Sequence, residues 1–242
     1  MKVYHTKKDI EKVLQNHSQA NESIGFVPTM GAIHQGHLSL VQYSVKENDT
    51  TVVSIFVNPT QFNEQADYQN YPRDLETDLA LLADHHVDYV FAPSEKEMYP
   101  EPDHRKFNFG NADKVMEGAH RPGHFNGVAI VVDKLFRIIQ PDKAYFGEKD
   151  YQQIVVIKKL TEQQNHPVEI VPCPIIREDD GLAMSSRNKL LTKEERKAAP
   201  VISQALFEAV SLSKSHSPQE VKDRIITKLN REPLINVEYF EI

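Results

Sequence analysis

Two histidines separated by three positions mark the part of the sequence where chemistry is most expected. Residues 28–40, PTMGAIHQGHLSL, hold His34 and His37 beside Gly31 and Gly36. Imidazoles at this spacing can lie on one face of the first turn of a helix and donate hydrogen bonds to phosphoryl oxygens. Glycine lets the backbone approach a ligand closely. The alternative is that the two histidines only cap or decorate a helix.

A buried strand and an amphipathic helix are the elements that must position this segment. Residues 24–27 are an apolar run typical of a buried strand, and Leu38, Val41 and Val45 follow with helical spacing. The turn between them presents unpaired backbone N–H groups and the positive end of the helix dipole, which suits phosphate. Neither a Walker loop nor a G-x-G-x-x-G motif is present. The segment therefore predicts a nucleotide site of another type.

The same arrangement of strand, polar turn and helix returns later in the chain. Residues 143–146 are expected to form a strand, 147–153 (GEKDYQQ) a turn, and 154–160 a helix. Lys149 is placed to meet phosphate as a point charge, and Gln153 lies one turn along the same helix. Further strands are expected at 51–57, 88–92 and 168–171, and further helices at 6–16, 72–85 and 128–139. This alternation predicts a parallel sheet with helices on both faces.

Several polar segments have two interpretations each. Gln61, in NPTQFN after the second strand, suits a small hydroxy acid but also an ordinary proline turn. Residues 117–128 (EGAHRPGHFNGV) suggest a mobile flap or a mere connector. Asp74 and Asp78 are expected to complement a helix dipole, with metal binding as the alternative. Cys173 is expected to be a buried filler thiol rather than a nucleophile.

Composition limits the classes of protein that remain. The 242 residues are 40% hydrophobic and 26% charged, as in a soluble globular protein. A net charge of −7 argues against a nucleic-acid surface. The single cysteine excludes an internal disulfide, no signal peptide or long apolar run opens the chain, and no CxxC or HExxH motif suggests zinc. We expect a cytoplasmic protein without a membrane or nucleic-acid partner.

The composition of the sequence changes near Ile176. Residues 177–188 are polar, charged helical segments occupy 192–231, and residues 235–242 alternate apolar and polar like a strand. A lone terminal strand must pair with something. We therefore expect domains at 1–176 and 177–242, the second a smaller α+β domain that is incomplete at its C-terminus.

Five segments in order identify a family resemblance: PTMGAIHQGH, NPTQF, RPGHFNGV, FGEKDYQQ and MSSRN. Together, over residues 25–188, they closely resemble pantoate–β-alanine ligases (pantothenate synthetases). His34–His37 resembles the HIGH signature, and Met184–Arg187 the KMSKS signature, of class I aminoacyl-tRNA synthetases and related nucleotidylyltransferases. The resemblance implies a Rossmann-like domain that binds ATP and pantoate, a C-terminal lid domain carrying the KMSKS-like loop, and a homodimer.

The resemblance also implies a role for each matching residue. The catalytic residues would be His34, His37, Lys149, Ser185, Ser186 and Arg187. ATP would be bound by Met30, Gly31, Ala32, Ile33, His34, Gln35, Gly36, His37, Gly147, Glu148, Lys149, Asp150, Ile176, Met184, Ser185, Ser186 and Arg187. Pantoate would be held by Gln61, Gln153 and Met30, and β-alanine by Gln61 and Arg121, although Arg121 could equally order its loop. Mg²⁺ would be carried by ATP with no direct protein ligand.

The activity implied is an AMP-forming ligation of pantoate with β-alanine through a pantoyl-adenylate, for pantothenate biosynthesis. Adenylation is needed because a free carboxylate would have to expel oxide. Positioning and electrostatics are then the tasks left to the protein. Two rivals are a simple nucleotidylyltransferase and a nucleotide-binding module without turnover, and the joint appearance of AMP and an amide separates them from the ligase. A tRNA synthetase is disfavoured by the short, acidic chain.

Overall fold

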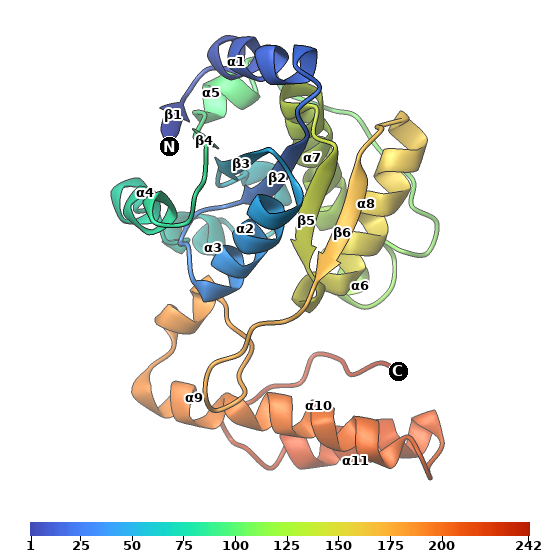
Figure 1. Cartoon of the computed structure of the whole chain (residues 1–242). Helices are drawn as coiled ribbons and strands as arrows, with labels where there is room; N and C mark the ends of the chain where they lie inside the picture. The colour runs from blue at the N-terminus through green and yellow to red at the C-terminus, as the bar shows by residue number, and fades with distance from the viewer. The chain divides into compact units, whose positions relative to one another are not determined.

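Parallel pairing of six strands builds the sheet that organises the first part of the molecule. The computed structural model describes all residues from 1 to 242 and divides into two compact units, Met1–Ile175 and Ile176–Ile242. The strands are β1 (Lys2–Tyr4), β2 (Ile24–Thr29), β3 (Thr50–Ile55), β4 (Tyr89–Phe91), β5 (Lys143–Gly147) and β6 (Glu169–Cys173). Their order across the sheet is β1-β4-β3-β2-β5-β6 (Figure 1). The predicted α/β class is confirmed for this unit.

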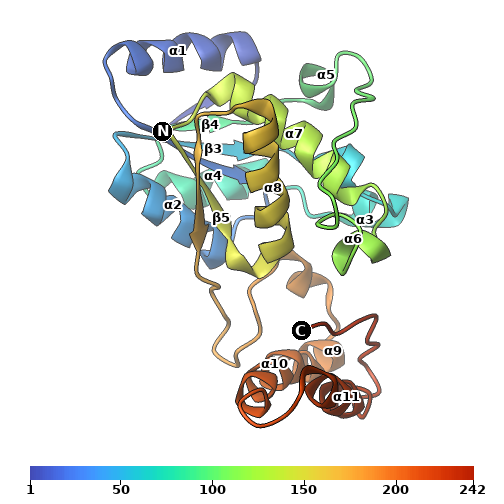
Figure 2. The ribbon, with the colours of Figure 1, turned by 90° about the vertical axis from the view of Figure 1, so that its right-hand side faces the viewer.

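Helices cover both faces of this sheet, as Figure 2 shows. One buried apolar cluster joins the sheet to α1 (Lys7–Gln19), α7 (His124–Ile139) and α8 (Tyr151–Gln164). A second cluster, on the other face, joins it to α2 (Gln35–Glu47) and α4 (Leu75–Ala83). Strands β2 and β3 are almost wholly buried, and the only polar side chains that they contain are the small hydroxyl residues threonine and serine. The remaining helices of the unit are α3 (Gln65–Asn70), α5 (Glu95–Met98) and α6 (Glu117–His120).

The strand order reverses between β2 and β5, which pair directly. From β2 the chain moves outward through β3 to β4, and from β5 it moves in the opposite direction to β6. The crevice at the carboxyl ends of strands on either side of such a reversal is where open α/β sheets bind ligands. The turn at residues 30–34 follows β2, and 3₁₀-helix η2 (Glu148–Asp150) follows β5. The fold thus brings the two predicted polar turns to one crevice.

The second unit is helical. It contains 3₁₀-helix η3 (Ser186–Leu190) and helices α9 (Lys193–Ala198), α10 (Pro200–Leu212) and α11 (Pro218–Leu229). Its small core lies between the last two helices and is formed by Ala205, Ala209, Val221, Ile225 and Leu229. Its only β pairing is an isolated antiparallel bridge between residues 177 and 183.

One expectation about secondary structure was wrong, and one strand was not predicted. Residues 235–242 form no strand, although Ile235, Val237 and Phe240 pack against the core of the second unit. Their alternation reflects one-sided packing of an extended segment that has no neighbouring strand to pair with. The expected strand content of an α+β domain is therefore absent from this unit. In the first unit, β1 was not expected, because three residues are too few to establish a period.

No helix of the chain has both the length and the apolar character needed to span a membrane.

Candidate active site

The turn after β2 is held by a carboxylate from a distant helix. Gly31 and Ala32 have φ angles of 79° and 50°. The amide of Ala32 donates to Oδ2 of Asp78 at 2.9 Å, and the amide of Ile33 donates to Oδ1 at 2.7 Å. The amide of Gly31 donates to Oγ1 of Thr29 at 3.1 Å. The expectation of unpaired backbone N–H groups was wrong for these three residues, because N–H groups buried under the turn require partners.

The next residues of the turn form a capping box made of two histidines. His34 is the N-cap of α2, and its Nδ1 accepts from the amide of Gly36 at 3.1 Å. His37 accepts the amide of His34 on its own Nδ1 at 3.4 Å. Both residues therefore cap the helix, and this capping is compatible with the phosphate contacts that the sequence predicts. A ring that accepts on Nδ1 while neutral carries its proton on Nε2, so we assign both rings the Nε2–H tautomer.

Electrostatics keep His37 neutral. The protein packed around the ring, the neighbouring His34 and the charge of Lys149 together lower the pKa of His37 to about 3. The two imidazole rings lie 4.0 Å apart between centroids. Lys149, on η2, donates to Oδ1 of Asp150 at 2.8 Å. At neutral pH the His37 imidazole is therefore an uncharged hydrogen-bond donor beside the positive charge of Lys149.

Predicted pantoate residues meet beside the turn. Gln61, at the end of 3₁₀-helix η1 (Pro59–Gln61), places Nε2 at 2.9 Å from Sδ of Met30. Its Oε1 accepts from Nδ2 of Asn58 at 3.1 Å, and Asn58 is buried. The structure thus brings together two of the three residues predicted to hold pantoate. Gln153 lies partly buried in the first turn of α8.

The segment from 117 to 128 is packed against the Gln61 loop. Nδ1 of His124 donates to the carbonyl oxygen of Gln61 at 2.8 Å, and Nη2 of Arg121 approaches the same oxygen at 3.4 Å. Asn58 donates through Nδ2 to the carbonyl of Gly127 at 3.2 Å. Most of these residues form α6 and the start of α7, with a short turn at 121–123 between the two helices. The contacts of Arg121 favour a loop-ordering role beside any role toward β-alanine.

The KMSKS-like loop is ordered within the second unit by its own hydrogen bonds. The amide of Met184 donates to the carbonyl of Ile176 at 3.0 Å, which brings these two predicted ATP residues together. Ser185 is the N-cap of η3, and its Oγ accepts from the amide of Arg187 at 3.3 Å. Ser186 is buried and Arg187 is exposed. The guanidinium is thus presented at the surface of a short, capped element.

Three other candidate residues, Cys173, Asp74 and Asp78, have burial or contacts that indicate structural roles. Cys173 is fully buried, and burial raises the pKa of its thiol to about 11, which favours the filler interpretation. Asp74 is the N-cap of α4 and accepts the amide of Thr77 at 3.0 Å. Asp78 serves the turn after β2 rather than its own helix. No group of three His, Cys, Asp or Glu side chains is arranged to hold a metal ion.

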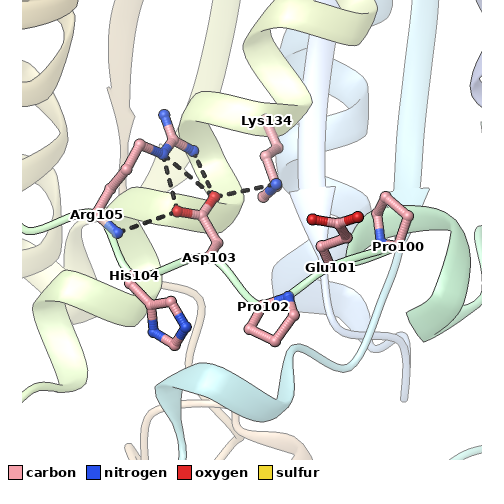
Figure 3. Close-up of a pocket in the computed structure, with 7 residues that line it drawn as sticks. All are labelled: Pro100, Glu101, Pro102, Asp103, His104, Arg105 and Lys134. Atoms are coloured by element: carbon pink, nitrogen blue, oxygen red, sulfur yellow. Dashed lines mark hydrogen bonds and ion pairs between the residues drawn. The ribbon is translucent and has the colours of Figure 1, made fainter.

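A surface hollow lies outside these residues, and Figure 3 shows its lining. It is formed by residues 100–105 and Lys134. Asp103 pairs with Nη2 of Arg105 at 2.8 Å and with Nζ of Lys134 at 3.0 Å. The Arg105 partner holds the pKa of Asp103 well below its usual range. Arg105 also pairs with the buried Asp133, so each of these three side chains already has an ion-pair partner within the protein.

Sequence reasoning missed the support residues Asp78, Asn58 and His124. Each one positions a predicted site residue through a backbone or side-chain hydrogen bond: Asp78 at the turn, and Asn58 and His124 at Gln61. Asp78 and His124 act across 45 and 63 positions of sequence. The sequence signal available for Asp78 was its position on the apolar face of the helix, three residues after Leu75 and four before Leu82.

Comparisons with known proteins agree with the family resemblance. The family model described as pantoate-beta-alanine ligase matches residues 2–242. The chain is 52% identical over 242 residues to the pantothenate synthetase of Bacteroides thetaiotaomicron, covering all of this chain and 86% of that protein. It is 51% identical, with the same coverage, to the pantothenate synthetase of Porphyromonas gingivalis.

Solved structures are similar over almost the whole chain. The crystal structure of pantothenate synthetase from Thermus thermophilus superposes with a TM-score of 0.89 and 42% identity, over 99% of this chain and 91% of that one. The pantoate-beta-alanine ligase of Francisella tularensis, complexed with beta-gamma ATP and beta-alanine, gives a TM-score of 0.82 and 39% identity, over 95% and 86% of the two chains.

Proposed function

The chain belongs to the pantoate–β-alanine ligase family, and on that premise we propose that it joins pantoate to β-alanine with ATP, releasing pantothenate, AMP and pyrophosphate. The observation that carries the proposal is the family match over residues 2–242 together with the meeting of the His34–His37 turn and Lys149 at one crevice. ATP is the co-substrate, and the product is pantothenate for its biosynthetic pathway.

The first half-reaction forms the pantoyl-adenylate. A carboxylate oxygen of pantoate attacks the α-phosphorus of ATP, a new P–O bond forms, and the bond to the bridging oxygen breaks so that pyrophosphate leaves. Negative charge moves onto the phosphoryl oxygens as this happens. The Nε2–H groups of His34 and His37 donate to these oxygens, and the Lys149 ammonium supplies positive charge beside them. A neutral imidazole suits this task because it loses no proton to the departing group.

The second half-reaction forms the amide. The amine of β-alanine attacks the acyl carbon, the C–O bond to AMP breaks, and the amine loses a proton. Gln61 and Met30 hold pantoate with Gln153, and Gln61 also contacts β-alanine. Arg121, which already approaches the carbonyl of Gln61, attracts the carboxylate of β-alanine. The protein contributes no covalent nucleophile, in keeping with the buried, high-pKa thiol of Cys173.

The C-terminal unit is proposed to act as a lid that carries the KMSKS-like loop. Ser185, Ser186 and Arg187 then hold the pyrophosphate end of ATP, and Ile176 and Met184 contact the nucleotide. The exposed Arg187 guanidinium provides the planar donors that phosphate groups accept. The remaining nucleotide contacts are assigned to the turn after β2 and to Gly147, Glu148 and Asp150 after β5.

Mg²⁺ is proposed to arrive on the phosphates of ATP. The chain's own carboxylates do not form a cage for it: Asp78 accepts two backbone amides and Asp150 pairs with Lys149. Magnesium is commonly held by substrate phosphates and water rather than by an all-protein site. When bound there, the ion neutralises phosphate charge.

We further propose a homodimer in the cytoplasm. Light scattering at twice the 27.7 kDa mass of one chain would support the dimer, and a monomer mass would exclude it.

Oxygen-isotope transfer tests the ligase directly. Pantoate labelled with ¹⁸O in its carboxylate is incubated with ATP, Mg²⁺ and β-alanine, and AMP and the amide product are measured by mass. One ¹⁸O atom is expected in AMP, with pantothenate formed in equal amount, because the carboxylate oxygen stays on phosphorus. Unlabelled AMP would exclude the adenylate. ATP binding with neither AMP nor amide would favour the nucleotide-binding module.

A further inference from the structure

We propose that Asp78 is a positioning residue for adenylation: its carboxylate fixes the left-handed turn at Gly31 and Ala32 and thereby the orientation of His34 and His37. The inference rests on the proposed function only for what the two histidines do. The placement of Asp78 itself is a property of the fold.

Asp78 reaches the turn with both oxygens at once. Oδ2 accepts the amide of Ala32 at 2.9 Å, and Oδ1 accepts the amide of Ile33 at 2.7 Å. The residue is 3% exposed, although it belongs to α4, an amphipathic helix on the sheet's outer layer. Hydrogen bonds to an ionised acceptor are stronger than neutral ones, and a low-dielectric surrounding strengthens them further. The two bonds fix the direction of two successive peptide groups.

The turn needs such a restraint because its backbone is strained. Ala32 has a φ of 50°, a conformation that an L-residue with a β-carbon adopts at a cost. Gly31 has a φ of 79°, and a β-carbon placed there would lie 2.7 Å from Oδ2 of Asp78. A glycine at 31 is therefore what allows the carboxylate to come close. Without the carboxylate, Ala32 would relax toward a common backbone conformation.

The strained turn leads directly into the two histidines. Ile33, whose amide is held by Asp78, is covalently bonded to His34. His34 caps α2, and its amide is accepted by His37. A rotation of the 32–33 peptide would therefore shift the capping box and both Nε2–H donors. Displacements near 1 Å at a catalytic group can lower a rate by about 10²-fold.

The interpretation of Asp78 as a helix-dipole complement does not explain these contacts. Its oxygens point to amides of a turn that lies 45 and 46 positions away, not to the N-terminal amides of α4. That task is performed by Asp74, which caps α4 through the amide of Thr77. Asp74 and Asp78 share a residue type and a helix but not a function, so they form a matched pair for a test.

The test compares Asp78→Asn with Asp74→Asn. Asparagine preserves the size of both side chains and caps a helix as well as aspartate does, so D74N should keep its rate within about twofold. At position 78 the amide nitrogen must face a backbone N–H, so D78N should lower kcat for adenylate formation by about 10- to 100-fold. The KM for pantoate should change by less than about threefold, because Gln61 is held by Asn58 and not by Asp78.

A double-mutant cycle separates positioning from general damage. Glycine at position 32 adopts a positive φ without strain, so D78N should cost several-fold less kcat in an Ala32→Gly background than in the parent. The imidazole ¹⁵N spectrum gives a readout without turnover: the parent should show His37 as the Nε2–H tautomer, and D78N a mixture. If D78N does not fold, Asp78→Glu, which keeps the charge, replaces it in the experiment. This variant should lower kcat while the KM for pantoate stays constant.

Equal kcat values for D78N and D74N would overturn the proposal. It would equally be overturned by a D78N rate loss of the same size in both backgrounds with an unchanged His37 spectrum, because Asp78 would then be merely structural. A parent chain that forms no AMP would contradict the proposed function alone. The ¹⁵N spectra of the parent and D78N would still decide whether Asp78 orients the histidines.

Discussion

His34 and His37 each combine a structural contact with the chemical contact that we propose for them. Nδ1 of each ring accepts a backbone amide at the start of α2, and this leaves Nε2–H as the donor. The same hydrogen bonds that start the helix thus select the tautomer. Aspartate would satisfy only half of this arrangement, because an ionised carboxylate caps a helix well but has no hydrogen to donate.

Replacing His37 by Ala should affect both contacts to different extents. AMP formation should fall by about 10²- to 10³-fold, because one donor to a charged transition state is lost. The free energy of unfolding should fall by about 1 kcal/mol, the usual cost of a lost cap. Steady-state kinetics and urea titration measure the two effects. His104→Ala, at an exposed histidine in the hollow of Figure 3, is the control and should change neither. A full rate in H37A would exclude the role of the donor.

The low pKa of His37 makes stability depend on pH in a defined direction. The pKa is lowered from 6.5 to about 3 in the folded chain, so between these values the unfolded chain binds a proton that the folded chain does not. The free energy of unfolding should therefore decrease as pH falls from 6.5 toward 3, by at most about 1.4 kcal/mol per pH unit. Urea unfolding at pH 7.0, 5.5 and 4.5 should show a smaller decrease for H37A. Parallel curves would contradict the assignment.

Replacing Gln61 tests whether its side chain binds pantoate. Gln61→Ala should raise the KM for pantoate by about 10- to 100-fold and the KM for ATP much less, because the polar groups of pantoate would be buried without a partner. Initial rates with each substrate varied in turn give both constants. Gln65→Ala, at an exposed glutamine in α3, is the matched control. Equal increases for both substrates would assign Gln61 to structure.

Residue types and spacing predicted His34, His37, Gln61 and Lys149 as members of one polar region, because each follows a strand of the same sheet. Sequence could not predict Asp78, since its partners are backbone amides and backbone amides have no sequence signature. Capping by the two histidines was raised only as an alternative, because capping boxes are usually recognised by serine or threonine followed by glutamate. Sequence reasoning therefore did not identify the residues that hold the backbone of the site in place.

At the scale of elements, η1 and the start of α7 act as a pair. The carbonyl of Gly127 accepts from Asn58, and the carbonyl of Gln61 accepts from His124. A β-carbon on Gly127 would lie 2.2 Å from the carbonyl oxygen of Thr60. The absence of a side chain at this position is what lets the helix approach the loop that carries Gln61.

Gly127→Ala should therefore push η1 and α7 apart. We expect a loss of about 1–3 kcal/mol in the free energy of unfolding, typical of overpacking, and a raised KM for pantoate. Gly147→Ala is the control for stability, because Gly147 has a φ of −76° and a β-carbon placed on it would meet no atom within 4 Å. Thermal unfolding of the two variants gives the comparison. A G127A variant as stable as G147A would show that the contact is easily relieved.

Sequence predicted the long, buried elements better than the short or exposed ones. The strands at β2, β3 and β5 and the helices at α2, α4, α7 and α8 appear where the apolar pattern indicated, with ends shifted by a few residues. Strand β1 was missed because pairing with β4, not its own composition, makes it a strand. Residues 235–242 show the reverse: they alternate as strands do, yet no partner pairs with them.

At the scale of the whole molecule, the two units differ in how much core they possess. The first unit has two large apolar clusters, one on each face of its sheet. The second has one cluster of five buried residues between two helices. Small domains bury a smaller fraction of their surface and are correspondingly less stable. The two units should therefore open at different free energies.

Hydrogen exchange should reveal this difference. Amides of α11 around Val221 and Ile225 are expected to exchange faster, under native conditions, than amides of α7 around Val132 and Leu135, because the smaller core opens at lower free energy. Mass spectrometry of peptic fragments measures both segments in one sample. Guanidinium titrated below the unfolding midpoint should narrow the gap, because opening of the larger unit exposes more surface. Equal protection in the two helices would show that the chain opens as one cooperative body.

The pairing of β2 with β5 has a consequence for how the protein is made. His37 and Lys149 are 112 positions apart in the sequence, and the segment between them contains β3, β4 and α7. A ribosome releases β2, β3 and β4 before β5 exists, so the histidine turn is synthesised long before the lysine that completes its charge. Contacts of such long range form slowly. Nucleotide recognition is therefore among the last properties that a newly made chain acquires.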